Sequence, residues 1–237
     1  MSIAENIAEV RDKIDAAARR ARRNSDEITL IAVSKTFPAE SIREAYQSGL
    51  RTFGESRVKE LTTKAAALSD LQNIEWHMIG HLQTNKAAKA VELFHAVDSL
   101  DSLRLAQKLN SAAEESGKKL RALIEINVGD EAAKTGIAPD SEELENILQA
   151  APRLPHLEIR GLMTVPPFTE DPQGARPFFR KLRQLRDQIA GRHLPNISMN
   201  VLSMGMSHDF EVAIEEGSTC VRVGTAIFGA RTYVSKD

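Results

Sequence analysis

The stretch ITLIAVSKTFPAE, residues 28–40, separates two possible folds. Its apolar run, 28–33, leads through Ser34 and Lys35 to Pro38, a residue favoured in the first turn of a helix. The pattern predicts a buried strand followed by a helix. The turn between them contains no glycine, whereas an open, doubly wound nucleotide-binding sheet has a glycine-rich turn after its first strand.

This strand-then-helix pattern recurs along the chain. Short apolar runs alternate with segments of helical periodicity, and connections of that length imply parallel pairing of the strands. Eight such runs are present, at 28–34, 51–55, 74–80, 94–99, 120–127, 157–165, 197–203 and 219–224. Eight units in 237 residues favour a closed (β/α)8 TIM barrel over the open sheet. We predict a single α/β domain spanning residues 1–237.

Caps and helix-breaking residues indicate where several helices begin and end. Residues 1–23 have apolar side chains at helical spacing and a basic end, which predicts an additional N-terminal helix packed on the barrel. We expect other helices to begin at Pro38, Ser56, Asp101 and Ser207. The helices that begin at Pro38, Asp101 and Ser207 should end near Gly49, Gly117 and Gly217, respectively.

Composition excludes several classes of protein. The formal net charge is −2 at pH 7, which gives no electrostatic case for a nucleic acid or an anionic membrane as a partner. The sequence has 1 cysteine, Cys220, which rules out an internal disulfide and a cysteine-based zinc site and fits the cytoplasm. The N-terminus lacks the continuous apolar core of a signal sequence or membrane anchor. The histidines show no metal-type spacing.

The functional site of such a barrel is built from the carboxyl ends of its strands. Two of these ends, LSMGMS (202–207) and VGTAIFG (223–229), combine small residues with hydrogen-bond donors. Loops after the seventh and eighth strands commonly hold a phosphate. The residues that could do so here are Ser203, Gly205, Ser207, Gly224 and Thr225. Two ordinary tight turns would explain the same residues, so both interpretations stay open at this point.

Lys35 is predicted to lie close to these two segments, because the first strand of a closed barrel neighbours the eighth. An amine in a partly apolar mouth loses its proton more readily and can attack a carbonyl carbon. An amine beside a phosphate site suits an aldehyde that carries a phosphate, and pyridoxal 5′-phosphate (PLP) is such a molecule. From the spacing alone, an ordinary solvated lysine is the simpler interpretation.

Six segments together resemble the pyridoxal-phosphate homeostasis protein family. They are AVSKTFP (32–38), FGESRVKEL (53–61), WHMIGHLQTNKAAKAV (76–91), VDSLDS (97–102), GLMTVPP (161–167) and LSMGMSHDFEVAIEEGSTCVRVGTAIFG (202–229). They occur in the order of the family, and IGHLQTNK and SMGMS are specific to it. The resemblance implies a fold-type III PLP barrel, similar to the N-terminal domain of alanine racemase.

The resemblance also implies roles for individual residues. Lys35 is expected to hold PLP covalently as a Schiff base, and Arg222 is similar to the arginine that faces the pyridine nitrogen. The expected phosphate contacts are Ser203, Gly224 and Thr225. The residues expected near the ring or the phosphate are His77, Met163 and Ser207.

Two segments depart from the family pattern. Ser56 and Arg57 stand where many members have Asn-Tyr or Asn-Arg, so a contact from position 56 is expected to differ. In the loop 127–137, only three residues match the pattern of the family, namely Asn127, Lys134 and Gly136. We assign no ligand role to that loop.

The resemblance implies binding of PLP rather than turnover. Arginine only donates hydrogen bonds, so Arg222 cannot keep the ring nitrogen protonated as a carboxylate does. Racemases of this fold carry a second, β-rich domain that supplies a catalytic tyrosine, whereas this sequence ends at Asp237 and has only Tyr46 and Tyr233. We expect a monomeric cytoplasmic carrier that keeps PLP exchangeable, with PLP-dependent apoenzymes as possible recipients.

Two alternatives remain at this stage. A PLP-dependent amino-acid racemase or related enzyme would need a proton shuttle, for which His81 and Lys86 are candidates. A PLP-free barrel, such as a Schiff-base aldolase or a phosphosugar isomerase, would also use Lys35. A bound yellow cofactor would exclude the second alternative, and a change in the chirality of alanine would favour the first.

Overall fold

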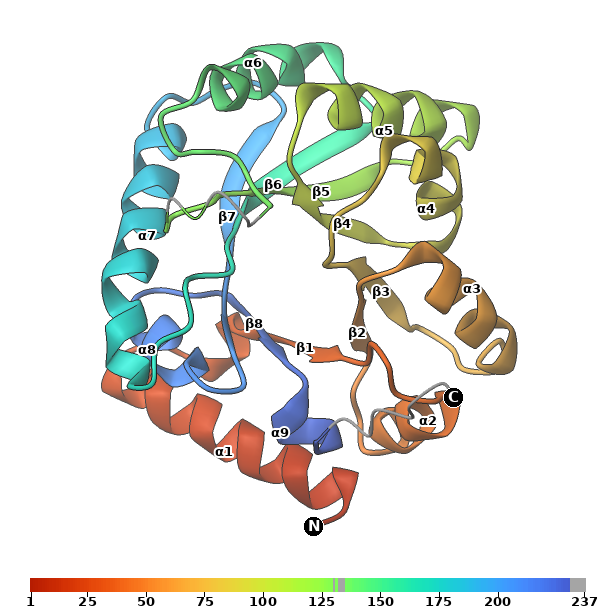
Figure 1. Ribbon diagram of the computed structural model, residues 1–237, viewed down its shortest axis with the longest axis vertical. Coiled ribbons are helices and arrows are strands. Elements are labelled where there is room, and N and C mark those ends of the chain that lie inside the picture. Colours follow the sequence, from red (N-terminus) through yellow and green to blue (C-terminus); the bar gives the residue numbers. More distant parts are fainter. Residues whose placement is uncertain (130, 132–134, 231–237) are drawn as a thin grey trace.

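The computed structural model describes residues 1–129, 131 and 135–230. Parallel strands form a closed barrel in which each strand pairs with the next in sequence and β8 pairs with β1 (Figure 1). The strands are β1 Thr29–Val33, β2 Thr52–Glu55, β3 Glu75–Met78, β4 Ala96–Leu100, β5 Leu120–Glu125, β6 Leu157–Met163, β7 Ile197–Met206 and β8 Cys220–Val223. Each overlaps one of the predicted apolar runs, and the prediction of a (β/α)8 barrel is confirmed.

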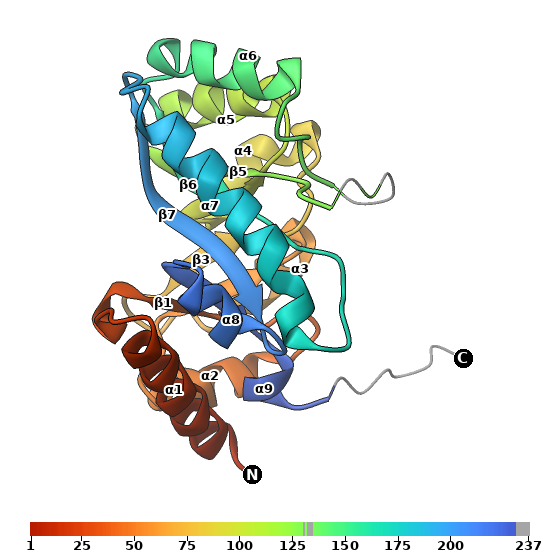
Figure 2. The same ribbon diagram turned by 90° about the vertical axis from the view of Figure 1, so that its left-hand side faces the viewer.

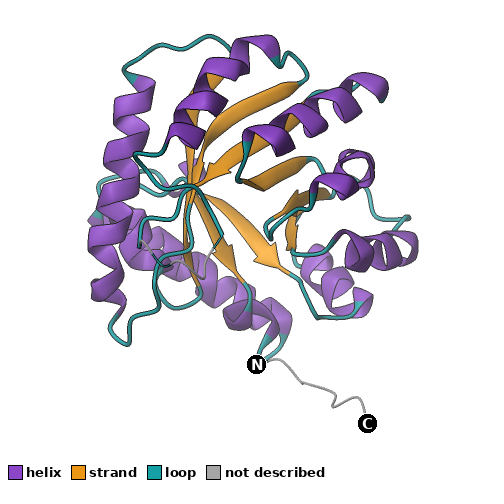
Figure 3. Cartoon of the chain, turned by 45° about the horizontal axis from the view of Figure 1, so that its top comes forward, coloured by secondary structure: helices purple, strands orange, loops and turns teal. Residues whose placement is uncertain are grey.

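Helices surround the barrel on its outside (Figure 3). Those of the described residues are α1 Ile3–Arg20, α2 Ala39–Gln47, α3 Val58–Ala67, α4 Ala87–Leu93, α5 Leu103–Glu115, α6 Glu142–Ala150, α7 Arg176–Ala190, α8 Phe210–Glu215 and α9 Thr225–Phe228. The expected N-terminal helix is present as α1 and begins with a capping box between Ser2 and Glu5. Ser56 does not cap α3, because Arg57 occupies the cap position.

Side chains of each strand alternate between the helices and the barrel interior. In β1, Ala32 packs in the core that the strands share with the helices. Ile31 and Val33 are buried on the opposite face of the strand, inside the barrel. The chain then leaves the strand at Ser34, so the residues that follow lie at the carboxyl end of the barrel.

The seventh strand is longer than predicted. β7 continues through Met206, so most of LSMGMS is strand rather than loop. Gly205 has φ +96°, and a Cβ atom there would lie 2.6 Å from the Cβ atom of Ala213 and 2.8 Å from the Cα atom of Phe210. Glycine at this position therefore allows α8 to pack directly on the strand.

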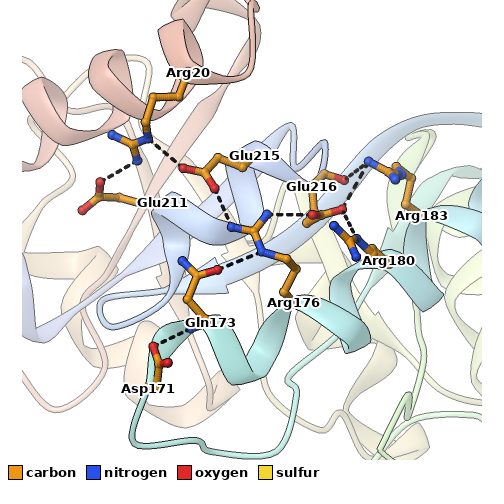
Figure 4. Close-up of polar contacts among 9 residues, drawn as sticks. All are labelled: Arg20, Asp171, Gln173, Arg176, Arg180, Arg183, Glu211, Glu215 and Glu216. Atoms are coloured by element: carbon orange, nitrogen blue, oxygen red, sulfur yellow. Dashed lines mark hydrogen bonds and ion pairs between the residues drawn. The ribbon is translucent and has the colours of Figure 1, made fainter.

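An ionic network joins α1, α7 and α8 (Figure 4). Arg20 of α1 donates to Glu211 at 2.9 Å and to Glu215 at 2.7 Å. Arg176 of α7 donates to Glu215 at 2.6 Å and to Glu216 at 2.7 Å. Two further arginines of α7 pair with Glu216, namely Arg180 and Arg183. The network fixes α8, which follows β7, against the N-terminal helix.

The short helix α9 lies beside α1 and near α2 in two perpendicular views (Figures 1 and 2). Asn6 of α1 donates a hydrogen bond from its side-chain amide to the Ile227 carbonyl at 2.9 Å. The N-terminal helix therefore supports the segment that follows β8. Among the helices that the structure describes, none combines the length and apolar character needed to span a membrane.

Candidate functional site

Lys35 lies in a tight turn directly after β1. The Phe37 N–H donates to the Ser34 carbonyl at 3.1 Å and closes a four-residue turn. Thr36 has φ +71°, a conformation that a β-branched residue rarely adopts and that a type II turn requires at its third position. Lys35, at the second position of this turn, is partly buried.

The turn lies against the segment that follows β8. A Cβ atom on Gly224 would lie 3.3 Å from the Val33 carbonyl oxygen, so the two backbones approach closely. The rings of Phe37 and Phe228 stack with their centroids 5.0 Å apart. The structure therefore brings the turn of Lys35 next to α9 and the residues at its start.

Ser207 lies beside this same segment. Its Oγ atom accepts hydrogen bonds from the N–H of Gly224 at 3.1 Å and from the N–H of Ala226 at 3.4 Å. Thr225, between them, is exposed. Small residues, hydroxyl groups and backbone N–H groups are the donor set of a phosphate site.

Arg222 is buried in the barrel interior and held by two hydrogen bonds. Its Nη1 donates to Ser203 Oγ at 2.6 Å, and its Nη2 donates to the Thr164 carbonyl at 2.7 Å. Met163 pairs with Ser203 across β6 and β7 and is fully buried. Arg222, Ser203 and Met163 thus form one cluster that spans β6, β7 and β8.

His77 does not join these residues. Its Nδ1 lies 3.0 Å from Asp98 Oδ2, and both side chains line a cavity of about 260 Å³. Other residues that line the cavity begin strands, among them Thr29, Glu75 and Cys220, so the cavity is at the amino-terminal end of the barrel. The residue lies within β3, Glu75–Met78. His77 thus lies toward the amino-terminal end of the barrel, and the expectation that it lies near the ring or the phosphate stays a prediction.

The pair of His77 and Asp98 has an electrostatic consequence. Burial acts to lower the pKa of His77, but the charge of Asp98 and its hydrogen bond outweigh this effect. The resulting pKa of His77 is about 9. The imidazolium form is therefore favoured inside the barrel at neutral pH.

Other residues singled out from the sequence lie around the rim or outside the site. Ser56 packs against Gly80, where an added Cβ atom would be 2.7 Å from the Ser56 carbonyl oxygen. His81 pairs with Asp101 at 2.8 Å and is half-exposed. Tyr46 donates its hydroxyl to the Gln72 carbonyl at 3.0 Å, on the outside of the barrel. Two residues lie outside the described part of the chain, Lys134 and Tyr233.

The residues that support the turn of Lys35 were not predicted from the sequence. Phe37 and Phe228 lie far apart in the sequence, so no local sequence pattern predicts that their rings are in contact. Glu60 and Lys64 are four residues apart in α3, a spacing that favours an ion pair on a helix and could have indicated one.

Comparisons with known proteins agree in family and fold. The family model of the alanine racemase N-terminal domain matches residues 6–232. The pyridoxal phosphate homeostasis protein of Aquifex aeolicus is 45% identical over 233 residues, which cover 98% of this chain and 100% of that protein. The protein of the same name from Escherichia coli K12 is 44% identical over 236 residues, with 99% of each chain covered.

Solved structures show the same architecture. The structure of PipY from Synechococcus elongatus with PLP bound is similar with a TM-score of 0.83 and 36% identity, over 96% of this chain and 100% of that one. An alanine racemase of Clostridium difficile has a TM-score of 0.72 at 15% identity, over 100% of this chain and 58% of that one. The latter likeness concerns the fold alone.

Proposed function

The chain belongs to the pyridoxal phosphate homeostasis protein family, and on that premise we propose that it binds PLP and helps to maintain the supply of PLP in the cell. The observation that carries the proposal is the contact between two segments that lie far apart in the sequence. Val33, two residues before Lys35, approaches Gly224 at the start of α9 so closely that a Cβ atom added to Gly224 would lie 3.3 Å from the Val33 carbonyl oxygen. An amine and a set of hydrogen-bond donors suited to a phosphate therefore lie at one end of the barrel, which supports the proposal.

The residues in this region fit the chemistry of PLP, which supplies an aldehyde and an electron-accepting ring when bound. The side chain of Lys35 is the candidate for the aldehyde, and Ser207, Gly224 and Thr225 are candidates for the phosphate. Arg222 is the candidate partner of the ring nitrogen. Its two hydrogen bonds to Ser203 and Thr164 fix the direction of the guanidinium group.

Covalent attachment at Lys35 would be reversible. Lys35 would hold PLP through its Nζ atom, and the aldehyde of the cofactor would supply the carbonyl chemistry of a linkage that is made with loss of water and undone by water. A linkage of this kind retains a reactive aldehyde and still allows exchange, which suits a carrier.

We propose that the protein is a carrier with no substantial turnover of amino acids. Arg222 is consistent with this role, because a guanidinium group donates hydrogen bonds and cannot accept the proton that strengthens the ring as an electron sink, but racemases with such an arginine still work, so this residue alone does not decide between carrier and enzyme. Tyr46, the tyrosine of the described residues, is hydrogen-bonded on the outside of the barrel and is not available as a catalytic group. The names of the relatives agree with a role in homeostasis.

The test is a visible absorption spectrum of the purified protein incubated with PLP, followed by borohydride reduction and peptide mass analysis. We expect a yellow species, fixed by reduction to Lys35 and absent from Lys35→Ala. A colourless protein would refute the proposal and leave the PLP-free aldolase as the better explanation of Lys35. Racemisation of alanine or release of a product from amino acids by the yellow protein would refute the carrier role.

We further propose that residues 1–237 act as one monomeric unit in the cytoplasm and deliver PLP to apoenzymes. The free thiol of Cys220 is consistent with a reducing compartment. Light scattering would give the mass of the particle in solution. Mixing the PLP-loaded protein with a PLP-dependent apoenzyme should restore the activity of that enzyme, and failure to do so would exclude direct delivery to it.

A further inference from the structure

Lys64 of α3 carries an ammonium group that is buried behind the turn of Lys35. Its side chain is 10% exposed. The Nζ atom donates to Glu60 Oε1 at 2.6 Å, to Glu55 Oε1 at 2.8 Å and to the Ser34 carbonyl at 2.9 Å. An ammonium group has three N–H donors, so each has one acceptor. The Ser34 carbonyl is the same atom that closes the turn.

Glu55, at the end of β2, is fully buried and provides a second contact to Ser34, this time to its side chain. Its Oε1 atom accepts a hydrogen bond from Ser34 Oγ at 2.6 Å. Burial raises the pKa of the Glu55 carboxyl, and Lys64 opposes that rise. The residue before Lys35 is thus fixed through both its backbone and its side chain.

Glu60 of α3 holds the residue after Lys35. Its Oε1 atom accepts from the Thr36 N–H at 2.6 Å and from Lys64. Thr36 has the φ angle of +71° that is unfavourable for a β-branched residue. A strained conformation of this kind persists where the surrounding contacts over-determine it, and the Glu60 carboxylate supplies one of those contacts.

We propose that Glu55, Glu60 and Lys64 are positioning residues for Lys35, a proposal that rests on the Schiff-base function. The three side chains act on Ser34 and Thr36, the two neighbours of Lys35, and fix the direction in which its side chain leaves the turn. An amine held in a fixed place loses less conformational freedom when it bonds to the aldehyde carbon. Formation of the bond is therefore favoured, although none of the three residues needs to touch the cofactor.

The test compares Glu60→Ala with Glu60→Gln. Glutamine keeps an oxygen that can accept from the Thr36 N–H, whereas alanine removes the acceptor. Glu60 is 22% exposed, so both variants should fold. Glu92→Ala in α4 is the matched control, since Glu92 accepts from Lys89 at 2.7 Å on another helix. The measurements are the equilibrium constant for the yellow species, the fraction fixed to Lys35 by borohydride, and hydrogen exchange of the peptide containing residues 34–37 without PLP.

We expect Glu60→Ala to bind PLP about three- to tenfold more weakly, which corresponds to part of the free energy of one charge-assisted hydrogen bond. The amide hydrogens of the 34–37 peptide should also exchange faster in this variant. Glu60→Gln should recover most of both properties, and Glu92→Ala should match the wild type. Equal PLP binding in Glu60→Ala and the wild type would overturn the proposal, whether or not hydrogen exchange changes. If borohydride never fixes PLP to Lys35 in the wild type, the proposed function itself is refuted. This outcome does not depend on the behaviour of the variants.

Discussion

The ring of Phe37 stacks on the ring of Phe228, with 5.0 Å between the centroids and 30° between the planes. Phe37 ends the turn that carries Lys35, and Phe228 ends α9, which begins with Thr225. The pair therefore joins the candidate amine to the candidate phosphate segment by a direct side-chain contact. A ligand that uses both segments at once gains from such a link, because their separation is fixed before it binds.

Phe37→Leu should weaken this link and leave an apolar side chain in its place. Aromatic pairs contribute about 1 kcal/mol beyond the area they bury, so we expect the free energy of unfolding to fall by about that amount. PLP binding should weaken as well. Denaturant unfolding of Phe37→Leu, Phe228→Leu and the double variant measures the coupling. If the two single effects simply add, the stack contributes nothing specific.

His77→Gln tests the buried pair with Asp98 through pH. The pKa of His77 is about 9 in the folded protein, against 6.5 for an unperturbed histidine. The folded state thus binds the proton more tightly, so the contribution to stability is complete below pH 6.5 and is lost as the pH rises through 9. A difference of this size corresponds to roughly 3 kcal/mol.

Urea unfolding of the wild type and of His77→Gln, from below pH 6.5 to above pH 9, would show the effect. The stability advantage of the wild type should shrink across that interval. Parallel curves for the two proteins would mean that His77 does not carry a raised pKa. Nuclear magnetic resonance titration of the His77 ring gives the pKa independently.

The barrel could be predicted from the sequence because its signals are local. Each apolar run and each capping residue acts within a few positions, and their alternation alone implies parallel pairing. The position of Lys35 followed from the same rule, since it comes directly after the first run. β7 was predicted too short because Gly205 looked like a turn residue. Gly205 is instead needed because α8 approaches the strand closely at this position, and a local sequence pattern does not predict that approach.

The environment of the site depends on contacts between distant segments. The resemblance alone implied that His77 lies near the ring or the phosphate, and no sequence pattern indicated its contact with Asp98, which comes from a neighbouring strand. The roles of Glu55 and Lys64 arise because α3 folds back over the turn of Lys35. Such pairings depend on how α3 lies across two neighbouring strands, which single-sequence periodicity does not specify.

Gly205→Ala distinguishes the packing role of this glycine from a role in holding phosphate. The added Cβ atom would lie 2.6 Å from the Cβ atom of Ala213, and φ is +96°. We expect a loss of about 3 kcal/mol or more in the free energy of unfolding without PLP, from overpacking and the left-handed backbone together. Gly117→Ala is the control, since φ is +63° and nothing lies within 4 Å of the added atom.

The control should lose about 1–2 kcal/mol, the cost of the backbone conformation alone. Unfolding in guanidinium chloride, with both variants free of PLP, gives the comparison. If Gly205→Ala were no less stable than Gly117→Ala and yet bound PLP poorly, the glycine would be required for the ligand rather than for α8.

Arg222→Lys tests the cluster that is proposed to face the ring of the cofactor. A lysine side chain is shorter and ends in a single point of positive charge, so it cannot reproduce the two diverging bonds to Ser203 Oγ and the Thr164 carbonyl. One buried acceptor would lose its partner, which costs about 1–3 kcal/mol. Ser203→Ala removes only the hydroxyl end of the same cluster and should cost about 1 kcal/mol.

The double variant of Arg222→Lys and Ser203→Ala should lose less stability than the sum of the two, because both changes break the same bond. The visible spectrum of the PLP-loaded protein adds a measurement that stability alone does not affect. If Arg222 faces the ring nitrogen, Arg222→Lys should shift the yellow band, whereas Ser203→Ala should weaken binding with the band in place. An unshifted band in Arg222→Lys would place the guanidinium group away from the ring and leave it a purely structural role between β6, β7 and β8.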